Sequence, residues 1–523
     1  MMGANAAPPV VSRFSTFLPY VLFVVSLGFF LYAAQLGWRT SLLEDQGFRQ
    51  TQTAISAYYM AEQGPKLAYE TPVLGPPWSV PFEFPLYQGL VAAAAAGLHT
   101  PLDQTGRFLS VAFFLLTLIP ANYLLARMKF ARDNRLVMLS LLLISPFYVY
   151  WSRAFLIEST VLFLSMSYLA CSVAFLKAPG CRSGSGAVVT GILASLVKIT
   201  TFVPFLLGVC LFGCYLAWAK YREDRSWAVP RRLAGQFVFL TAPAFLLLVW
   251  WTHFADAVKE LSHLGHWMTS GTLTTWIFGT WDDRVSLTEW SLILTRFGLI
   301  VGHFACVVFC VPGLWFGGRR LHVAAALGLA LSAPLLFTKL YFHHEYYAYA
   351  NGVFLLAAVG RGLVVLRERG GWCRRAAHVG LLVFAAAGLV RYHHYFYPKQ
   401  TSHATKRWLE ELFAVIREET QPEDVVVAMG SDWSAEIPYY SHRRALMIPN
   451  WKLYEFAQDP QTYLKDLEGY RIGALVVYNP TVKRVAPGTV PRVVEAAHLN
   501  PSGRSARGDL YTVYSAKAPG HDR

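Results

Sequence analysis

Residues 17–36 read FLPYVLFVVSLGFFLYAAQL, and after a short polar connection residues 43–54 read LEDQGFRQTQTA. The apolar run is about 20 residues long, which is the length that a helix needs to cross a bilayer. Glu44 and Asp45 therefore stand where a membrane helix meets water. Ionisable groups in such a place often mark a reaction or binding site, although Asp is also common at the start of a helix.

The whole chain has the composition of a multi-pass membrane protein. Of its 523 residues, 54% are hydrophobic and only 15% are charged, and apolar runs recur from residue 17 to residue 390. The net charge of +14 comes from Lys and Arg gathered in short connections between the runs. This pattern is typical of cytoplasmic loops, so no nucleic-acid partner is expected. We interpret the first run as an uncleaved anchor.

The basic connections predict a topology of about eleven spans. An apolar stretch at 84–98 is too short to cross, so it is predicted to be an interfacial helix inside a large first outer loop, residues 38–106. This choice keeps all the basic clusters inside and places Lys198 near an outer turn and everything after Arg391 outside. The further predicted spans are residues 108–125, 136–150, 155–175, two within 187–218, 235–251, 292–315, 323–336, 347–366 and 376–390.

The sequence divides into a membrane domain, residues 1–399, and an extracytoplasmic soluble α/β domain, residues 400–523. In the second part the hydropathy drops, and strands are predicted at 424–430, 445–448, 472–478 and 510–515, with helices at 404–419, 453–467 and 490–497. All seven cysteines fall in predicted spans or cytoplasmic loops, so no disulfides are expected. We place the protein in the inner (plasma) membrane of a bacterium.

Acids and cations gather at the outer ends of the predicted spans. A carboxylate can act as general base on a hydroxyl, while Lys, Arg and His stabilise a phosphate leaving group. Structural alternatives exist, because Arg153 and Glu158 could neutralise each other and Lys198 could simply reach for the interface. Taken together, the residues predict transfer from a lipid-phosphate substrate whose tail stays in the bilayer. The candidates are Glu44, Asp45, Arg49, Glu83, Arg153, Glu158, Lys198, His343, His344 and Tyr346.

A divalent metal is considered as a cofactor. Glu83 with His263 or His266 could supply oxygen and nitrogen ligands, but the three residues show no tight ligand spacing. No other cofactor is predicted.

The order of these motifs resembles the C-type (GT-C) membrane glycosyltransferases, specifically the superfamily of protein O-mannosyltransferases (dolichyl-phosphate-mannose-protein mannosyltransferases) and aminoarabinose transferases. The resemblance covers about residues 17–370. It implies a GT-C fold and an inverting glycosyltransferase that moves a hexose or pentose from a polyprenyl-phosphate donor to a hydroxyl acceptor on the extracytoplasmic face, as part of making a cell-envelope glycan. Its motifs are Asp45, EFPLY at 83–87, GRFLS at 106–110, the stretch from Ser145 to Glu158, the run 191–200 and HEYY at 344–347.

The resemblance also implies residue roles. Asp45 or its neighbour Glu44 would be the general base, Glu158 would support the second half of the site, and Glu83 would organise a metal or the phosphate. The acceptor, whether lipid, glycan or protein, stays open, since Phe84 stands where the aminoarabinose branch usually has lysine. The residues expected to bind the donor phosphate are Arg49, Arg153, Lys198, His343, His344 and Tyr346.

Two other classes of protein were weighed. A transporter or flippase of a lipid-linked sugar would carry polar residues through the whole bilayer depth and show repeated halves, whereas here these residues gather at the outer ends. A scaffold would use the C-terminal domain to bind a partner, with GSDWS at 430–434 and YYSHRR at 439–444 as its surface.

Overall fold

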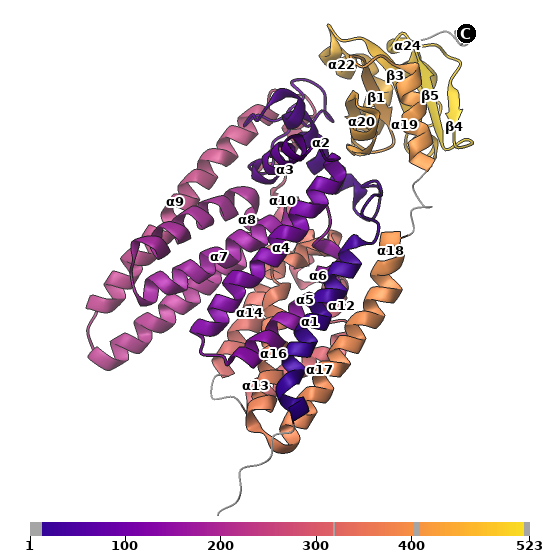
Figure 1. Cartoon of the computed structure of the whole chain (residues 1–523). Coiled ribbons are helices and arrows are strands. Elements are labelled where there is room, and N and C mark those ends of the chain that lie inside the picture. The colour runs from indigo at the N-terminus through magenta and orange to yellow at the C-terminus, as the bar shows by residue number, and fades with distance from the viewer. Residues whose placement is uncertain (1–12, 317–319, 402–407, 517–523) are drawn as a thin grey trace, which may run out of the picture.

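The computed structural model describes residues 13–316, 320–401 and 408–516. Figure 1 shows a long bundle of helices with a small α/β unit at one end. Large apolar side chains of the bundle face outward, among them Val24 on α1 (Arg13–Gln35), Ile119 on α4 (Leu102–Arg127) and Leu246 on α9 (Ala228–Lys259). Such a surface is costly in water and suits the hydrocarbon of a bilayer.

Six helices in the described residues are long and apolar enough to cross a membrane, or seven if a pair bent by 74° is counted as one span. The other predicted spans are shorter or broken. The span predicted at 136–150 breaks at Ser145, whose extended backbone precedes Pro146, because a residue before proline is driven out of the helical region. The remaining long helices are α7 (Glu158–Lys177), α8 (Cys181–Asp224) and α17 (Gly371–Arg391), the last continuing to Thr401.

Helix α8 contains the turn that the sequence predicts at Lys198. Lys198 alone has non-helical backbone angles, φ −165° and ψ 99°, inside this 44-residue helix. The two halves run along α7 in opposite directions. The contacts that show the reversal are Gly184 with Phe175 and Gly191 with Tyr168 before the break, and Phe202 with Tyr168 and Phe212 with Lys177 after it.

The first outer loop holds two helices, α2 (Gly47–Gln63) and α3 (Leu86–Leu98). Helix α3 coincides with the apolar stretch that the sequence predicts to be helical. It is fixed to α4 by Tyr87, whose hydroxyl donates to the carbonyl of Gly106 at 2.7 Å and lies 2.8 Å from the hydroxyl of Ser110. The loop is therefore packed on the bundle.

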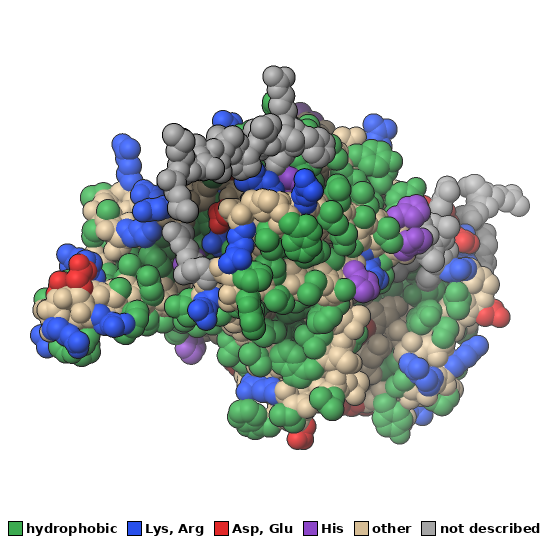
Figure 2. Space-filling model, turned by 90° about the horizontal axis from the view of Figure 1, so that it is seen from below, with side chains coloured by type: hydrophobic (Ala, Val, Ile, Leu, Met, Phe, Trp, Pro, Cys, Tyr) green, Lys and Arg blue, Asp and Glu red, His purple; other side chains and the backbone are tan. Residues whose placement is uncertain are grey.

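Short helices complete the bundle. They are α5 (Arg132–Ile144), α6 (Pro146–Trp151), η1 (Gly265–Met268), α10 (Thr274–Phe278), α11 (Trp281–Val285), α12 (Leu287–Ile300), η2 (Phe304–Cys310), α13 (Val311–Trp315), α14 (Arg320–Leu336), α15 (Thr338–His343), η3 (Glu345–Tyr349), α16 (Gly352–Arg369), the π-helical η4 (Tyr392–Phe396) and α18 (Tyr397–Thr401). Seen from the end away from the α/β unit, the bundle shows groups of Lys and Arg side chains between apolar patches (Figure 2).

The α/β unit contains a five-stranded sheet in the order β2-β1-β3-β5-β4. Strands β2, β1 and β3 are parallel, and β5 and β4 continue antiparallel. Its strands are β1 (Val425–Met429), β2 (Arg444–Ile448), β3 (Ile472–Tyr478), β4 (Arg504–Ala506) and β5 (Tyr511–Ser515). Its helices are α19 (Trp408–Glu419), α20 (Glu436–Ser441), α21 (Leu453–Gln458), α22 (Pro460–Leu464), η6 (Lys465–Leu467), α23 (Asn479–Val485) and α24 (Val490–Ala496).

The predicted strands match four of these five, and the three-residue β4 was missed. The helix predicted at 453–467 is split at Pro460, where the side chain of Asp459 accepts from the amide of Thr462 and starts a new helix. Residues 404–407 of another predicted helix lie outside the described residues.

The first outer loop extends the sheet at its β2 edge. The amide of Ala445 donates to the carbonyl of Pro72 at 3.1 Å and the amide of Met447 to that of Val73 at 2.9 Å. Leu74 and Leu446 form an antiparallel bridge. An open sheet edge leaves backbone groups unpaired, so this pairing both covers the edge and fastens the α/β unit to the loop.

This docking predicts a crosslink. Residues opposite each other in an antiparallel pair have Cα atoms about 4.5 to 5.5 Å apart, within disulfide reach. The variant Leu74→Cys/Leu446→Cys is therefore expected to form an intramolecular disulfide under mild oxidation, detected by mass spectrometry of non-reduced peptides. Leu74→Cys/Ser505→Cys, with the second cysteine on the far strand β4, is the control. An equal yield of crosslink in both variants would contradict the docking.

Candidate functional site

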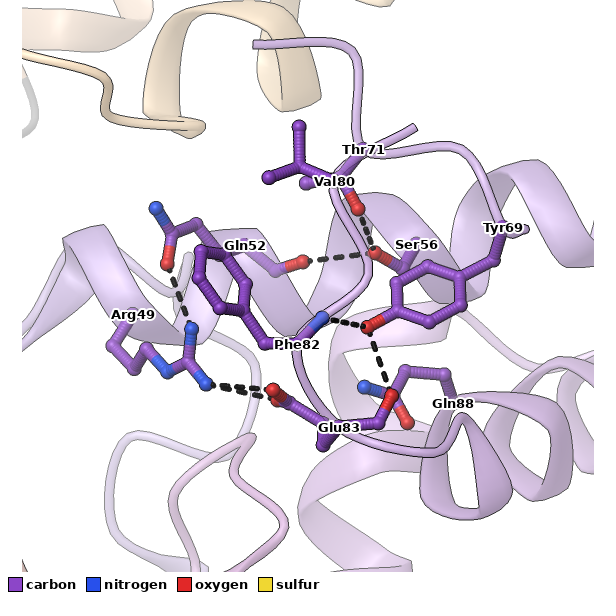
Figure 3. Close-up of a pocket in the computed structure, with 9 residues that line it drawn as sticks. All are labelled: Arg49, Gln52, Ser56, Tyr69, Thr71, Val80, Phe82, Glu83 and Gln88. Atoms are coloured by element: carbon purple, nitrogen blue, oxygen red, sulfur yellow. Dashed lines mark hydrogen bonds and ion pairs between the residues drawn. The ribbon is translucent and has the colours of Figure 1, made fainter. Parts of the chain in front are cut away.

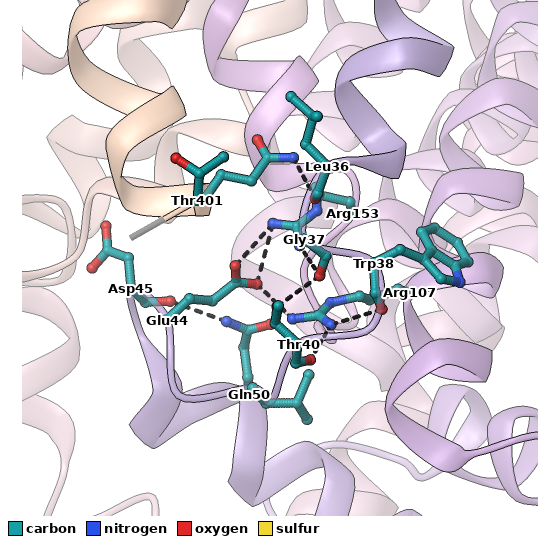
Figure 4. Close-up of polar contacts among 12 residues, drawn as sticks. Leu36, Gly37, Trp38, Thr40, Glu44, Asp45, Gln50, Arg107, Arg153 and Thr401 are labelled. Atoms are coloured by element: carbon teal, nitrogen blue, oxygen red, sulfur yellow. Dashed lines mark hydrogen bonds and ion pairs between the residues drawn. The ribbon is translucent and has the colours of Figure 1, made fainter. Parts of the chain in front are cut away.

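Glu44 is the centre of a buried ion cluster. Its carboxylate accepts from Arg107 Nη2 and from Arg153 Nη1, each at 3.0 Å, and its side chain is only 4% exposed. Arg107 also donates to the carbonyl of Thr40, and Arg153 to that of Gly37 (Figure 4). Burial alone would raise the pKa of Glu44, but the two guanidinium groups lower it below its ordinary value. Glu44 is thus a fixed anion that ties the loop after α1 to the bundle.

This cluster corrects two predictions about Arg153. The side chain of Arg153 is 1% exposed and engages Glu44, so it is not placed to bind a phosphate. Nor does it neutralise Glu158, which pairs with Lys198 instead. The reason is local: residues 152–157 form turns between α6 and α7, so two residues close in sequence point into different clusters.

Asp45 points away from Glu44 (Figure 4). Its carboxylate accepts from Lys399 Nζ at 2.7 Å, and its side chain is 26% exposed. Its backbone carbonyl accepts from the buried side chain of Gln50, whose own oxygen accepts from the amide of Phe155 at 2.9 Å. Gln50 therefore ties the backbone of Asp45 to the turn before α7. Of the two acids, Asp45 is the one that a substrate can reach.

A second acid lies beside Asp45. Glu345 Oε1 is 3.7 Å from Lys399 Nζ, and Glu345 Oε2 accepts from the hydroxyl of Tyr395 at 2.7 Å. Burial raises the pKa of Glu345, and the Lys399 ammonium opposes that rise. The sequence analysis missed Lys399 and Tyr395, because both lie more than 300 residues from the loop and no local pattern connects them.

Lys198 and Glu158 form the second ion pair of the site. Lys198 Nζ donates to Glu158 Oε1, and it lies 4.0 Å from the ring centre of Tyr347 and 5.1 Å from that of Tyr346. An ammonium over two aromatic faces is held in place by attraction to the ring electrons. The other oxygen of Glu158 is buried and has no hydrogen-bond partner. The break in α8 thus places the Lys198 ammonium between Glu158 and the rings of Tyr346 and Tyr347.

Arg49 and Glu83 form a two-pronged pair in the first outer loop (Figure 3). Arg49 Nη2 donates to both carboxylate oxygens, at 2.9 and 3.0 Å, while Nη1 donates to the side chain of Gln52. Burial acts to lower the pKa of Arg49, but Glu83 and the nearby Tyr346 outweigh it and raise the pKa. Arg49 is therefore a permanent cation on the same side of the site as Lys198.

His344 lies close to the cations Lys198 and Arg49. Its ring lies 5.4 Å from that of Tyr346 and 5.8 Å from that of Tyr347. Burial and then the charges of His343, Lys198 and Arg49 lower its pKa to about 4, so it is neutral at pH 7. His343 turns away and stacks on Trp276 with ring centres 4.4 Å apart.

The residues predicted to bind a metal do not come together. Glu83 is occupied by Arg49, His263 Nδ1 lies 3.3 Å from Asp466 in the α/β unit, and His266 lies beside Trp267. Within the described ranges, no three His, Cys, Asp or Glu residues are grouped so that they could hold a metal ion. Glu83 acts instead as the partner of Arg49.

The chain is similar to solved structures in fold. No protein-family model and no curated protein sequence matches it. ArnT from Cupriavidus metallidurans, an aminoarabinose transferase, matches in its apo state with a TM-score of 0.58 at 13% identity, over 96% of this chain and 97% of that one. The same protein bound to undecaprenyl phosphate matches with a TM-score of 0.58 at 14% identity, over 97% and 98%.

A more distant match is the apo oligosaccharyltransferase of Archaeoglobus fulgidus, with a TM-score of 0.52 at 13% identity over 89% of this chain and 70% of that one. These proteins are GT-C glycosyltransferases. The chain therefore has the same fold as these structures, which confirms the GT-C fold predicted from the sequence.

The Glu44 cluster predicts a loss of stability on mutation. Glu44→Gln leaves two buried arginines without their counter-charge, which typically costs about 3 to 5 kcal/mol. We expect a clearly lower unfolding temperature in detergent. Glu223→Gln, at an exposed acid paired with Lys220, is the matched control and should unfold like the wild type. Equal unfolding temperatures for all three proteins would show that the cluster is not needed.

His344 predicts a pH effect on stability. Its pKa of about 4 lies below the ordinary 6.5, so the unfolded chain binds its proton more readily than the native chain does. Lowering the pH from 6.5 to 4 therefore destabilises the wild type through this group, by about 2 to 3 kcal/mol. His344→Asn should weaken the pH dependence of thermal unfolding in this window, while the exposed control His266→Asn should not. An unchanged dependence in His344→Asn would contradict this.

Proposed function

We propose that the chain is an inverting glycosyltransferase that moves a sugar from a polyprenyl-phosphate donor to a hydroxyl acceptor at the extracytoplasmic face. The observation that carries this proposal is the arrangement around residues 344–347. His344, with Tyr346 and Tyr347, faces the cations Arg49 and Lys198, while the adjacent Glu345 belongs with Asp45 and Lys399. A carboxylate and a pair of cations thus flank one short segment.

The chemistry follows from this division. Asp45 takes the proton of the acceptor hydroxyl as its oxygen attacks the anomeric carbon of the sugar. The bond from that carbon to the phosphate oxygen breaks on the opposite side, so the configuration inverts. The electron pair leaves with the polyprenyl phosphate, whose added negative charge is stabilised by Lys198 and Arg49. Neutral His344 can donate a hydrogen bond to the same phosphate.

Glu158 and Glu83 act through the cations. Each acid orients one cation, Glu158 holding Lys198 and Glu83 holding Arg49. A Lys or Arg side chain that is already oriented loses less conformational entropy when the phosphate binds. Tyr346 forms a wall of the site, since it packs under the Lys198 ammonium. His343 stacks on Trp276 and is not placed to bind the phosphate.

Further observations support a polyprenyl-phosphate donor and a site on the extracytoplasmic side of the membrane. A structurally similar ArnT was solved with undecaprenyl phosphate, a polyprenyl phosphate. Long apolar helices beside the site would let the donor tail remain in the bilayer. Basic groups at the far end of the bundle suit the cytoplasmic side of a bacterial plasma membrane, and this supports an extracytoplasmic position of the site and the α/β unit.

Replacement of the base tests the mechanism. Purified wild type and Asp45→Asn are supplied with undecaprenyl-phosphate-linked mannose, glucose, arabinose or aminoarabinose and an extract of envelope lipids and glycans as acceptor. We expect the wild type to release undecaprenyl phosphate from one donor, and Asp45→Asn to do so about 100-fold more slowly or worse, since a general base contributes at least that much.

The control is Asp282→Asn, at an exposed acid of an outer segment, which should keep the wild-type rate. A full rate in Asp45→Asn would refute the assigned base. Movement of the labelled donor across liposomes without release of undecaprenyl phosphate would favour a flippase instead.

A further inference from the structure

We propose that Lys399 is a positioning residue for this transfer: it holds the Asp45 carboxylate in the direction of the acceptor, and it couples that carboxylate to the segment that binds the donor phosphate. This proposal rests on the function proposed above. It is carried by the contacts of Lys399, which reaches Asp45 at 2.7 Å and Glu345 at 3.7 Å and lies 4.1 Å from the ring centre of Tyr395.

The backbone of Lys399 is fixed by its surroundings. It lies on α18, the end of the helix that runs on from α17 through the π-helical η4. The buried side chain of Gln400 donates to the carbonyl of Leu36 at the end of α1 and accepts from the hydroxyl of Tyr392 at 2.8 Å. A π-helical turn shifts the face on which the following residues lie, and such turns are frequent at functional sites. The π-helical turn before α18 therefore determines that Lys399 lies on the face of the helix that is directed to Glu44 and Asp45.

Several groups besides Lys399 face Asp45. Arg296 contributes to the electrostatics of Glu345, but its Nη1 donates to the carbonyls of Tyr341 and Phe342, so it is engaged by backbone. Among the residues that the structure describes, Lys399 is the cation in contact with both carboxylates. The described groups that interact with Asp45 are Tyr150 on α6, Glu345 on η3 and Lys399 on α18, with Glu44 next to it on the same loop, while Arg296 on α12 and Tyr395 on η4 act on Glu345.

Without the ammonium, two carboxylates would face each other. Like charges repel each other, so the Asp45 carboxylate would turn away from Glu345 and lose the direction that Lys399 gives it, and a misplaced base is a poor catalyst of proton transfer. The pair is also partly open, with Lys399 29% and Asp45 26% exposed, and ion pairs of that kind add little to stability. The main effect of Lys399 is therefore expected on the reaction rather than on the fold.

The link to the phosphate site runs along the chain. Glu345, the second partner of Lys399, follows directly after His344, which lies among Lys198, Arg49 and the two tyrosines. Lys399 thus joins the loop that carries the base to the segment that faces the phosphate. It also lies at the end of the bundle from which the chain passes to the α/β unit (Figure 1).

The test is the steady-state kinetics of transfer by Lys399→Met. The rate is measured as release of undecaprenyl phosphate from whichever donor of the panel above the wild type consumes. We expect kcat to fall about 10- to 100-fold with the donor KM within two-fold, because the base is misplaced while the cations of the phosphate site are unchanged. A general loss of structure would change both values.

Three further variants complete the test. Lys399→Arg should restore most of kcat, because it returns a cation to the same place. Asp45→Asn/Lys399→Met should be no slower than Asp45→Asn alone, since both changes affect the same step. Lys220→Met, at an exposed lysine that pairs with Glu223, is the control. Lys399→Gln replaces the methionine variant where that protein does not fold.

The outcomes separate the two proposals. A wild-type kcat in Lys399→Met and Lys399→Gln, or a further loss in the double variant, would overturn the role of Lys399 while leaving Asp45 as base. Full activity in Asp45→Asn would overturn both. Thermal unfolding of the Asp45, Lys399 and double variants checks that they fold, and only small shifts are expected because the ion pair is partly exposed.

Discussion

The ion cluster of Glu44 with Arg107 and Arg153 is the constraint on which the site depends. It joins the loop after α1 to α4 through Arg107 and to the turn before α7 through Arg153. Burying three charges carries a large desolvation cost, so such a cluster is better explained by the geometry it enforces than by stability alone. Here the two arginines hold Glu44 on one side of the loop, and the next residue, Asp45, therefore points to the other side.

The rest of the site is built on neighbouring residues with opposite partners. Glu44 faces two arginines while Asp45 faces Lys399, and His344 faces the cations of the proposed phosphate site while Glu345 faces the base. In the proposed mechanism, these two short segments separate proton transfer from phosphate binding, because consecutive side chains point in opposite directions. The α/β unit fixes the same outer loop through the backbone hydrogen bonds between strand β2 and residues 72 to 74.

Much of the fold follows from local pattern, and the site follows only in part. The apolar runs, the break at Lys198 and four of the strands were predicted because period and length are local properties. Pro146 divided an expected span because proline dictates the backbone before it. The assignment of Arg153 to phosphate failed because closeness in sequence is no guide to contact across a turn. Lys399 could not be predicted, since it is 354 residues away from Asp45 in the sequence. Glu83 was predicted to bind a metal, but in the structure it forms an ion pair with Arg49.

A structure of the protein with undecaprenyl phosphate tests the central claim most directly. The account predicts that the phosphate lies within hydrogen-bond distance of Lys198, Arg49 and His344, with Glu158 and Glu83 still beside their cations and the Asp45 carboxylate on the other side of residues 344–347. A phosphate bound away from these three residues, or against the basic groups at the far end of the bundle, would contradict it.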